Sequence, residues 1–188
     1  MLSSAFYIMG PSGSGKDSVI EAVTEHFQDH VSRPPRYITR AITNGDAEQH
    51  NVISDDVFNE LLSKNCFSLS WEANGYRYAY DKQWLKDLAE EKIVLLNGSR
   101  EYWSEAKALF ATQLIPIELD LDLDVQRARL ESRGRESQAE IEERIERNQQ
   151  LSIGMADDIV KLDANQPLVD VVNDFIGLIM QFKKGASC

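Results

Sequence analysis

Continuous apolar runs alternate along the chain with segments whose apolar residues recur every three or four positions. The runs at residues 5–9 (AFYIM) and 93–97 (IVLLN) are typical of strands buried on both faces of a sheet. Two similar runs, at residues 115–121 and 159–162, predict further strands. Helical spacing follows the runs and predicts helices over residues 18–28, 101–111, 137–150 and 169–182. This alternation predicts a parallel sheet covered by helices on both faces.

The segment 33–81 interrupts the alternation and is interpreted as an insertion on an α/β core. It predicts a helix over residues 54–62 and three short strands, at residues 37–39, 67–71 and 76–80. The last two strands are separated by Asn74-Gly75, a pair typical of hairpin turns. Four positions along the chain carry helix-capping residues: Ser54, Asp81, Asp122 and the capping box Ser137–Glu140.

Composition narrows the class of protein. The chain has 188 residues, of which 43% are hydrophobic, so one compact domain is expected. Its formal net charge of −11 disfavours general binding to nucleic acid or to anionic membranes. No apolar run approaches the ~20 residues of a membrane span, and the N-terminus lacks the basic start of a signal peptide. Cys66 and Cys188 suggest neither a disulfide framework nor a zinc site, so we expect a cytoplasmic protein with reduced thiols.

A glycine-rich segment, GPSGSGKDS, lies between the first predicted strand and the first predicted helix. In this context backbone N–H groups surround a phosphate, and the Lys16 ammonium reaches the terminal phosphates of a nucleotide. The predicted ATP-binding residues of this loop are Gly10, Pro11, Ser12, Gly13, Ser14, Gly15, Lys16, Asp17 and Ser18.

The residue after the lysine departs from the usual phosphate-loop pattern. Asp17 stands where Ser or Thr is standard, and the hydroxyl follows one position later, at Ser18. The strand 93–97 ends in Asn97, where many P-loop proteins keep an acidic residue. Magnesium accepts carboxylate oxygens readily. We therefore predict that Asp17 supplies the missing carboxylate and that Asp17 and Ser18 form the Mg²⁺ site.

Arginines are concentrated in a chain that is otherwise acidic, and their planar fork of donors matches phosphate oxygens. Phosphoryl transfer depends on positioning and on neutralising the charge of the transferred group. Arg127 and Arg147 are expected to form surface pairs with neighbouring glutamates. No candidate general base is found, which favours a phosphate over an alcohol as acceptor, because a phosphate monoester is largely ionised at pH 7.

Four motifs, in order over nearly the whole chain, resemble the guanylate kinase branch of the nucleoside monophosphate kinases: GPSGSGK, RYITR, SW…NGYRY and RLESRGRE…ERI. The resemblance implies an α/β P-loop NTPase fold with a parallel-sheet core, an acceptor-binding insertion and a small helical lid. On this chain it implies a single kinase domain, residues 1–188. Its parts would be a core (1–32, 82–124 and 148–188), an insertion (33–81) and a lid (125–147).

The resemblance breaks where that family binds its acceptor. Arg40 matches the first of two phosphate-binding arginines, whereas Thr43 stands in place of the second. Ser70 replaces a guanine-reading glutamate, Tyr80 replaces a serine, and Asn97 replaces an acidic residue. Loss of such partners costs about 10⁴–10⁵ in discrimination at a polar specificity site. GMP is therefore disfavoured as a substrate.

A closer resemblance is to the ribose 1,5-bisphosphate phosphokinases encoded with bacterial phosphonate-degradation enzymes. The segments that carry it are GPSGSGKDS, RYITR, LSWEANG, LLNGSR and RLESRGRE. That family transfers the γ-phosphoryl of ATP to the 1-phosphate of its acceptor and forms 5-phosphoribosyl 1-diphosphate.

The resemblance implies roles for particular residues. It implies catalytic roles for Lys16, Arg133 and Arg144, and an ATP contact by Arg129. The implied acceptor-binding residues are Tyr37, Arg40, His50, Tyr78 and Arg100. The expected ligands are ATP with Mg²⁺ and a small sugar bisphosphate, with no nucleic acid and no membrane, and both a monomer and a homodimer remain open.

Two other functions remain open. The first is an active guanylate kinase with an altered acceptor site, against which Ser70 and Thr43 argue. The second is a catalytically silent guanylate-kinase-like interaction module that binds partner peptides, against which the intact phosphate loop and the lid arginines argue.

Overall fold

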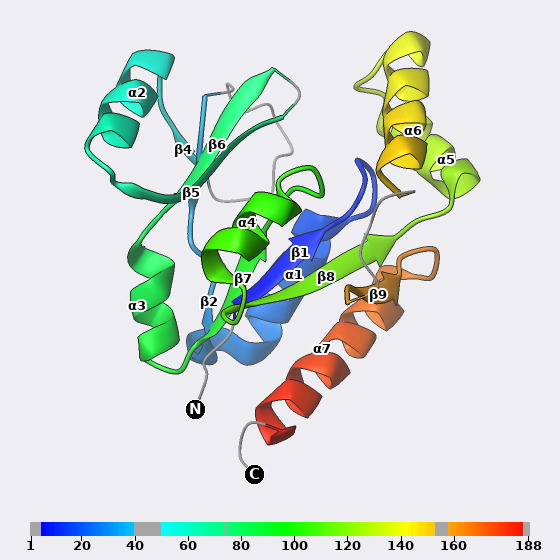
Figure 1. Ribbon diagram of the computed structural model, residues 1–188. Helices are drawn as coiled ribbons and strands as arrows, with labels where there is room; N and C mark the ends of the chain where they lie inside the picture. The colour runs from blue at the N-terminus through cyan, green and yellow to red at the C-terminus, as the bar shows by residue number, and fades with distance from the viewer. Residues whose placement is uncertain (1–4, 40–49, 74, 153–157, 186–188) are drawn as a thin grey trace.

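The computed structural model describes residues 5–39, 50–73, 75–152 and 158–185. Four positions used in the sequence analysis lie outside these ranges: Arg40, Thr43, Asn74 and Cys188. The described chain forms two sheets and a separate pair of helices (Figure 1). All structural statements below concern the described residues.

The larger sheet is parallel throughout and forms the centre of the molecule. Across it the strands follow the order β2 (Val31–Ser32), β7 (Ile93–Asn97), β1 (Ala5–Met9), β8 (Leu114–Asp120) and β9 (Val160–Asp163). One face is covered by α1 (Lys16–Phe27) and α7 (Leu168–Gly185). The other face is covered by α3 (Gln83–Ala89) and α4 (Trp103–Phe110). The parallel sheet predicted from the apolar runs is confirmed.

Strand β1 shows why these runs have no polar alternation. Phe6 and Ile8 pack with α1 and α7, whereas Tyr7 and Met9 pack with α3 and α4. Every residue of the strand is buried. Because both faces of the sheet are covered, neither side of the strand can carry exposed polar residues.

The second sheet is built by the inserted segment and lies beyond the carboxyl ends of the central strands (Figure 1). Its order is β4 (His50–Val52), β3 (Arg36–Ile38), β6 (Tyr76–Asp81) and β5 (Phe67–Ala73). The predicted hairpin is confirmed as the antiparallel pair β5–β6. Helix α2 (Asp55–Ser63) packs on this sheet through Phe58, and Ser54 Oγ accepts a hydrogen bond from the N–H of Val57, as predicted for its N-cap.

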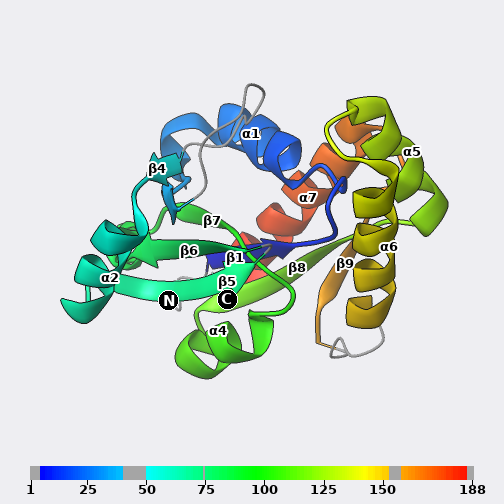
Figure 2. The same ribbon diagram turned by 90° about the horizontal axis from the view of Figure 1, so that it is seen from above.

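The helices α5 (Leu123–Arg133) and α6 (Gln138–Ser152) lie on the opposite side of the phosphate loop from the second sheet (Figure 2). They pack against each other through Leu130, Ile141 and Ile145. The predicted capping box is confirmed, because Ser137 N donates to Glu140 Oε2 over 2.7 Å and Glu140 N donates to Ser137 Oγ over 3.4 Å.

Some details of the elements differ from the sequence prediction. Asp122 takes the N-cap position of α5, but its side chain accepts no capping bond, and its N–H instead donates to Asn165 Oδ1. Asp81 does accept the N–H of Gln83, although Lys82 is the residue that precedes α3. The short elements β2, β4 and the 3₁₀ turn Gln28–His30 were not predicted, because two or three residues carry no measurable periodicity.

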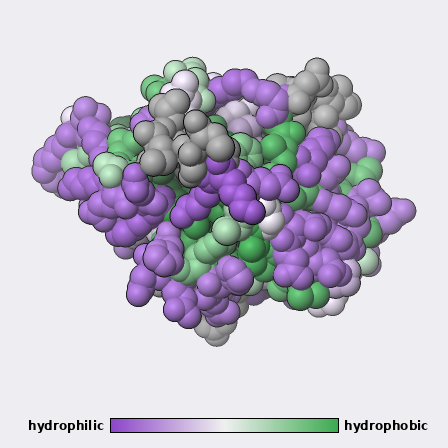
Figure 3. All heavy atoms as spheres, turned by 90° about the horizontal axis from the view of Figure 1, so that it is seen from below, coloured by the Kyte–Doolittle hydropathy of each residue, from purple (hydrophilic) through white to green (hydrophobic). Residues whose placement is uncertain are grey.

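The surface of the described residues carries large apolar side chains from several elements, such as α4 and α7. On the face shown in Figure 3, hydrophobic residues are interspersed among hydrophilic ones. No helix in the described ranges is both long enough and apolar enough to span a membrane.

Gly98, directly after β7, allows the backbone there to lie close to the Tyr7 ring of β1. A Cβ atom added at Gly98 would lie 2.2 Å from Cζ of the Tyr7 ring, which is fully buried. We expect Gly98→Ala to lower the free energy of unfolding by about 2–3 kcal/mol through overpacking. Gly177→Ala, on an open face of α7, is the matched control and should raise it by up to about 1 kcal/mol. Urea denaturation measures both, and equal stabilities for the two variants would contradict this packing.

Candidate active site

The phosphate loop lies between β1 and α1, at the carboxyl edge of the central sheet. Gly10 has no room for a side chain, because a Cβ there would lie 2.9 Å from the carbonyl oxygen of Leu119. Gly15, with φ of +85°, turns the chain directly into α1. Lys16 Nζ donates to the carbonyl oxygens of Gly10 (2.8 Å) and Pro11 (3.1 Å), so its ammonium lies over the loop. A helix N-terminus, a tight glycine turn and a cation together form a phosphate-binding arrangement.

Asp17 and Asn97 contact each other across the edge of the sheet. Asn97 Nδ2 donates to Asp17 Oδ1 over 2.6 Å, and Asn97 is only 4% exposed. The carboxylate of Asp17 therefore lies at the end of β7, beside the position where the sequence lacks an acidic residue. Ser18 is exposed on α1.

The oxygen donors at this position suit magnesium. No group of three or more His, Cys, Asp or Glu side chains in the described ranges could hold a metal. A Mg²⁺ ion at Asp17 would therefore complete its coordination with nucleotide phosphate oxygens and water, as it commonly does. The residues present fit an ion that arrives with the nucleotide.

Two arginines of α5 and α6 contact the loop, and a third shares a carboxylate with one of them. Arg144 Nη1 donates to Ser12 Oγ over 2.5 Å, and Arg129 Nη1 donates to the Gly13 carbonyl oxygen over 3.4 Å. Arg133 pairs with Glu136 at the turn between the helices, and Arg144 Nη2 lies 3.5 Å from the same carboxylate. The Glu136 side chain is only 5% exposed, and its contacts with both arginines hold the two guanidinium groups close together.

The two arginines expected to form surface pairs do so. Arg127 pairs with Glu142 across the two helices, and Arg147 pairs with Glu101. Both contacts are at the surface, where such pairs contribute at most about 1 kcal/mol.

Arg100 has a different environment from that expected of an acceptor-binding residue. Its side chain is 6% exposed, and Nη1 lies 3.6 Å from Glu118 Oε1, whose side chain is 3% exposed. The same nitrogen donates to Asn148 Oδ1 over 2.6 Å. Burial lowers the pKa of the Arg100 guanidinium. These contacts favour a structural role for Arg100 over contact with a small acceptor.

A chain of hydrogen bonds continues from Arg100 to the phosphate loop through two buried amide side chains. Asn148 Nδ2 donates to Gln126 Oε1 over 2.8 Å, and Gln126 Nε2 donates to the Ser12 carbonyl oxygen over 3.1 Å. Gln126 and Asn148 are both buried. These two residues were not predicted from the sequence, because amide side chains in highly charged helices are typical of solvent-exposed positions.

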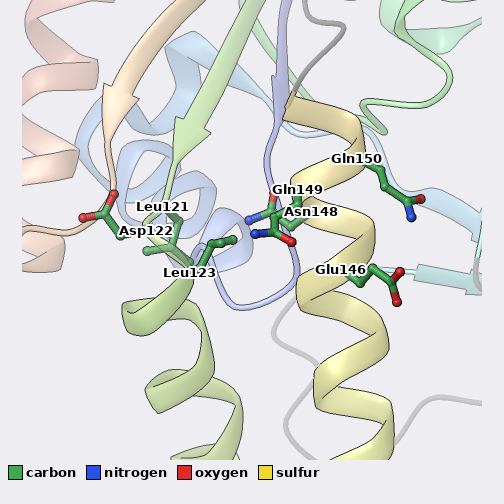
Figure 4. Close-up of a pocket in the computed structure, with 7 residues that line it drawn as sticks. All are labelled: Leu121, Asp122, Leu123, Glu146, Asn148, Gln149 and Gln150. Carbon is green, nitrogen blue, oxygen red and sulfur yellow. The ribbon is translucent and has the colours of Figure 1, made fainter.

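A hollow of about 620 Å³ lies beside this chain, between the start of α5 and the second half of α6. Figure 4 shows Asn148 and Gln149 directed toward the phosphate-loop side, and Glu146 and Gln150 directed away from it. The residues that line it are Leu121, Asp122, Leu123, Glu146, Asn148, Gln149 and Gln150. None of the predicted site residues is among them.

On the insertion side, stacked rings form the face of the second sheet that packs toward the central core. Trp71 stacks on Tyr78 with centroids 5.6 Å apart, and on Tyr102 with centroids 5.7 Å apart. The Arg36 guanidinium lies 5.0 Å from the centre of the Tyr78 ring. His50 pairs in register with Arg36 on the adjacent strand, so the two residues share one face of the sheet.

Tyr37 lies on the other face. Its ring packs 5.2 Å from that of Phe67, in the cluster formed with α2. Burial and the neighbouring Asp81 carboxylate raise the pKa of the Tyr37 hydroxyl. The structure thus brings His50 and Tyr78 to one face of the sheet but not Tyr37, and Arg40 lies outside the described residues.

The fold and the loop define an α/β nucleotide-binding protein of the P-loop class. The family model for guanylate kinase matches residues 3–176, and the chain belongs to the guanylate kinase family.

Curated relatives and solved structures give closer comparisons. A Pantoea vagans protein named ribose 1,5-bisphosphate phosphokinase PhnN is 38% identical, over 75% of this chain and 79% of its own. A Desulfomicrobium baculatum protein of the same name is 35% identical, over 96% of each chain. The crystal structure of guanylate kinase from Anaplasma phagocytophilum superposes with a TM-score of 0.70 at 15% identity, covering 97% of this chain and 86% of the other.

Removing Arg100 tests whether it is structural. Arg100→Met leaves the Glu118 carboxylate buried without this partner, and we expect the free energy of unfolding to fall by about 3–5 kcal/mol. The double variant Arg100→Met/Glu118→Met should recover most of this loss, because it removes both charges. Urea denaturation measures the effect. An unchanged stability with a large rise in the KM for the acceptor would instead support direct acceptor binding.

Proposed function

We propose that the protein transfers the γ-phosphoryl group of ATP to the 1-phosphate of ribose 1,5-bisphosphate, forming 5-phosphoribosyl 1-diphosphate. The names of the curated relatives support this activity. The structural support for an acceptor of this kind comes from the hydrogen bonds of Asn97. Asn97 N donates to the Tyr80 hydroxyl over 2.9 Å, and the Asn97 side chain is held by Asp17. Two positions at which the family resemblance places guanine-reading groups thus bond to protein groups, which favours an acceptor without a purine.

The residues near the loop support a direct transfer between phosphates. An oxygen of the acceptor's 1-phosphate forms a bond to the γ-phosphorus as the bond to the β,γ-bridging oxygen breaks, and ADP leaves. The attacking oxygen is already ionised, so no general base is needed. In this proposal Lys16 binds the nucleotide phosphates, and Arg133 and Arg144 neutralise the transferred group. Arg129 fixes α5 on the loop and contacts ATP.

Asp17 is the proposed protein ligand of Mg²⁺, with Ser18 as the adjacent hydroxyl. When bound, the ion neutralises charge on the phosphate oxygens of ATP. The contribution of the chain is to orient the carboxylate, which the Asn97 amide does through its hydrogen bond.

The proposed acceptor is tested by comparing two substrates. Purified protein with MgATP should release ADP rapidly with ribose 1,5-bisphosphate, and at least about 1,000-fold more slowly, by kcat/KM, with GMP. Lys16→Met is the control for contaminating kinases and should be inactive with both. Turnover of GMP alone would establish a guanylate kinase instead, and ATP binding without any turnover would favour the silent module.

The metal role of Asp17 has its own test. Asp17→Asn keeps an oxygen for the Asn97 amide but removes the charge. We expect the Mg²⁺ concentration for half-maximal activity to rise about tenfold or more, because a neutral amide is a weaker ligand for this hard cation. Glu21→Gln, on the exposed side of the same helix, should leave that concentration unchanged. An unaltered Mg²⁺ dependence in Asp17→Asn would contradict the assignment.

A further inference from the structure

Ribose 1,5-bisphosphate, the acceptor on which this inference depends, carries two phosphates. Lys16 and Arg144 contact the phosphate loop, and in the proposed function they bind the nucleotide phosphates and the transferred group. The 5-phosphate needs a cationic partner elsewhere. Arg100, the residue predicted to meet a second phosphate, is buried and bonds to Glu118 and Asn148. The 5-phosphate therefore needs another partner, which we sought among the described residues, since Arg40 lies outside them.

Arg36 has the position that such a residue requires. It begins β3 on the second sheet, is half-buried, and its Nη1 lies 3.4 Å from the Asn97 carbonyl oxygen. The side chain of Asn97 bonds to Asp17 at the start of α1. The Arg36 guanidinium is thus connected through the hydrogen bonds of Asn97 to Asp17, which directly follows the phosphate-loop lysine.

The ring of Tyr78 fixes the orientation of this guanidinium. The group lies 5.0 Å from the ring centre, and the ring itself stacks on Trp71 with an interplanar angle of 14°. A guanidinium held against an aromatic face keeps its plane and loses little conformational freedom when it binds a ligand. Its fork can then present parallel N–H groups to two oxygens of one phosphate.

We propose that Arg36 binds the 5-phosphate of the acceptor and determines the preference for a sugar bisphosphate. GMP carries an uncharged base in place of a second phosphate, and ribose 1-phosphate carries no second phosphate. Of these three acceptors, only the bisphosphate offers Arg36 a second phosphate to bind. Tyr78 acts as a positioning residue, since it holds the guanidinium rather than the substrate phosphate.

The test compares acceptors that differ only in the 5-phosphate. For the unaltered protein, kcat/KM with ribose 1,5-bisphosphate should exceed that with ribose 1-phosphate by about 100-fold or more, the effect of hydrogen bonds to a charged group. Arg36→Met should reduce this ratio to near 1 by lowering only the activity with the bisphosphate. Arg36→Lys, which keeps the charge but loses the fork, should give an intermediate ratio.

The matched control is Arg77→Met, which removes an arginine of the same sheet that pairs with Asn59 and lies over the Phe58 ring. It should leave the ratio unchanged. If Arg36→Met fails to fold, the inhibition constant of ribose 5-phosphate against Arg36→Lys gives the same information, and we expect it to rise about tenfold.

Three outcomes would overturn the proposal. An unchanged ratio in an active Arg36→Met would show that the 5-phosphate is bound elsewhere. An equal loss of activity with both acceptors would show that Arg36 only supports the site. Absence of turnover by the unaltered protein with ribose 1,5-bisphosphate would remove the proposed function itself, and with it this role for Arg36.

Discussion

The hydrogen bonds of Asn97 connect the parts of the molecule that must act together. Its amide donates to Asp17 on α1, its N–H donates to Tyr80 on β6, and its carbonyl oxygen accepts from Arg36 on β3. Asn97 is almost completely buried, and each unpaired polar group there would cost about 1–3 kcal/mol. The position of the phosphate loop relative to the second sheet therefore depends on this one residue at the end of β7.

A second chain of polar contacts connects α5 and α6 to the phosphate loop. Its members run from Arg100 through Asn148 and Gln126 to the Ser12 carbonyl oxygen. Because its two central members, Gln126 and Asn148, are buried, the chain helps to hold α5 and α6 against the loop. Glu136 then keeps Arg133 and Arg144 together at the turn between these helices. Both sides of the proposed site are thus set by buried polar contacts rather than by apolar packing alone.

The sequence was sufficient to predict the hairpin, the phosphate loop and every strand of the central sheet except β2, because each of these has a strong local pattern. The buried runs of β1 and β7 have no polar alternation, and the glycine-rich loop lies between a strand and a helix. The faces of the second sheet could not be predicted in this way. A three-residue strand places Arg36 and Tyr37 on opposite faces, and only the tertiary contacts decide which face meets the core.

The sequence also did not indicate which polar residues are buried. Gln126 and Asn148 lie in helices whose other residues are mostly charged, so nothing in their spacing marks them as interior. In the sequence Arg100 has the features of a ligand-binding arginine. In the structure it pairs instead with Glu118 on β8. Ion pairs between distant segments depend on the topology of the sheet, which a local pattern does not contain.

In the proposed reaction the site joins a phosphoryl group to a phosphate of an acceptor that has no purine. The most direct measurement is ³¹P NMR of the protein with MgATP and ribose 1,5-bisphosphate. We expect a new pair of mutually coupled diphosphate signals besides those of ADP, with the 5-phosphate signal retained as a monoester. An unchanged acceptor spectrum, together with conversion of GMP to GDP in a parallel sample, would contradict it.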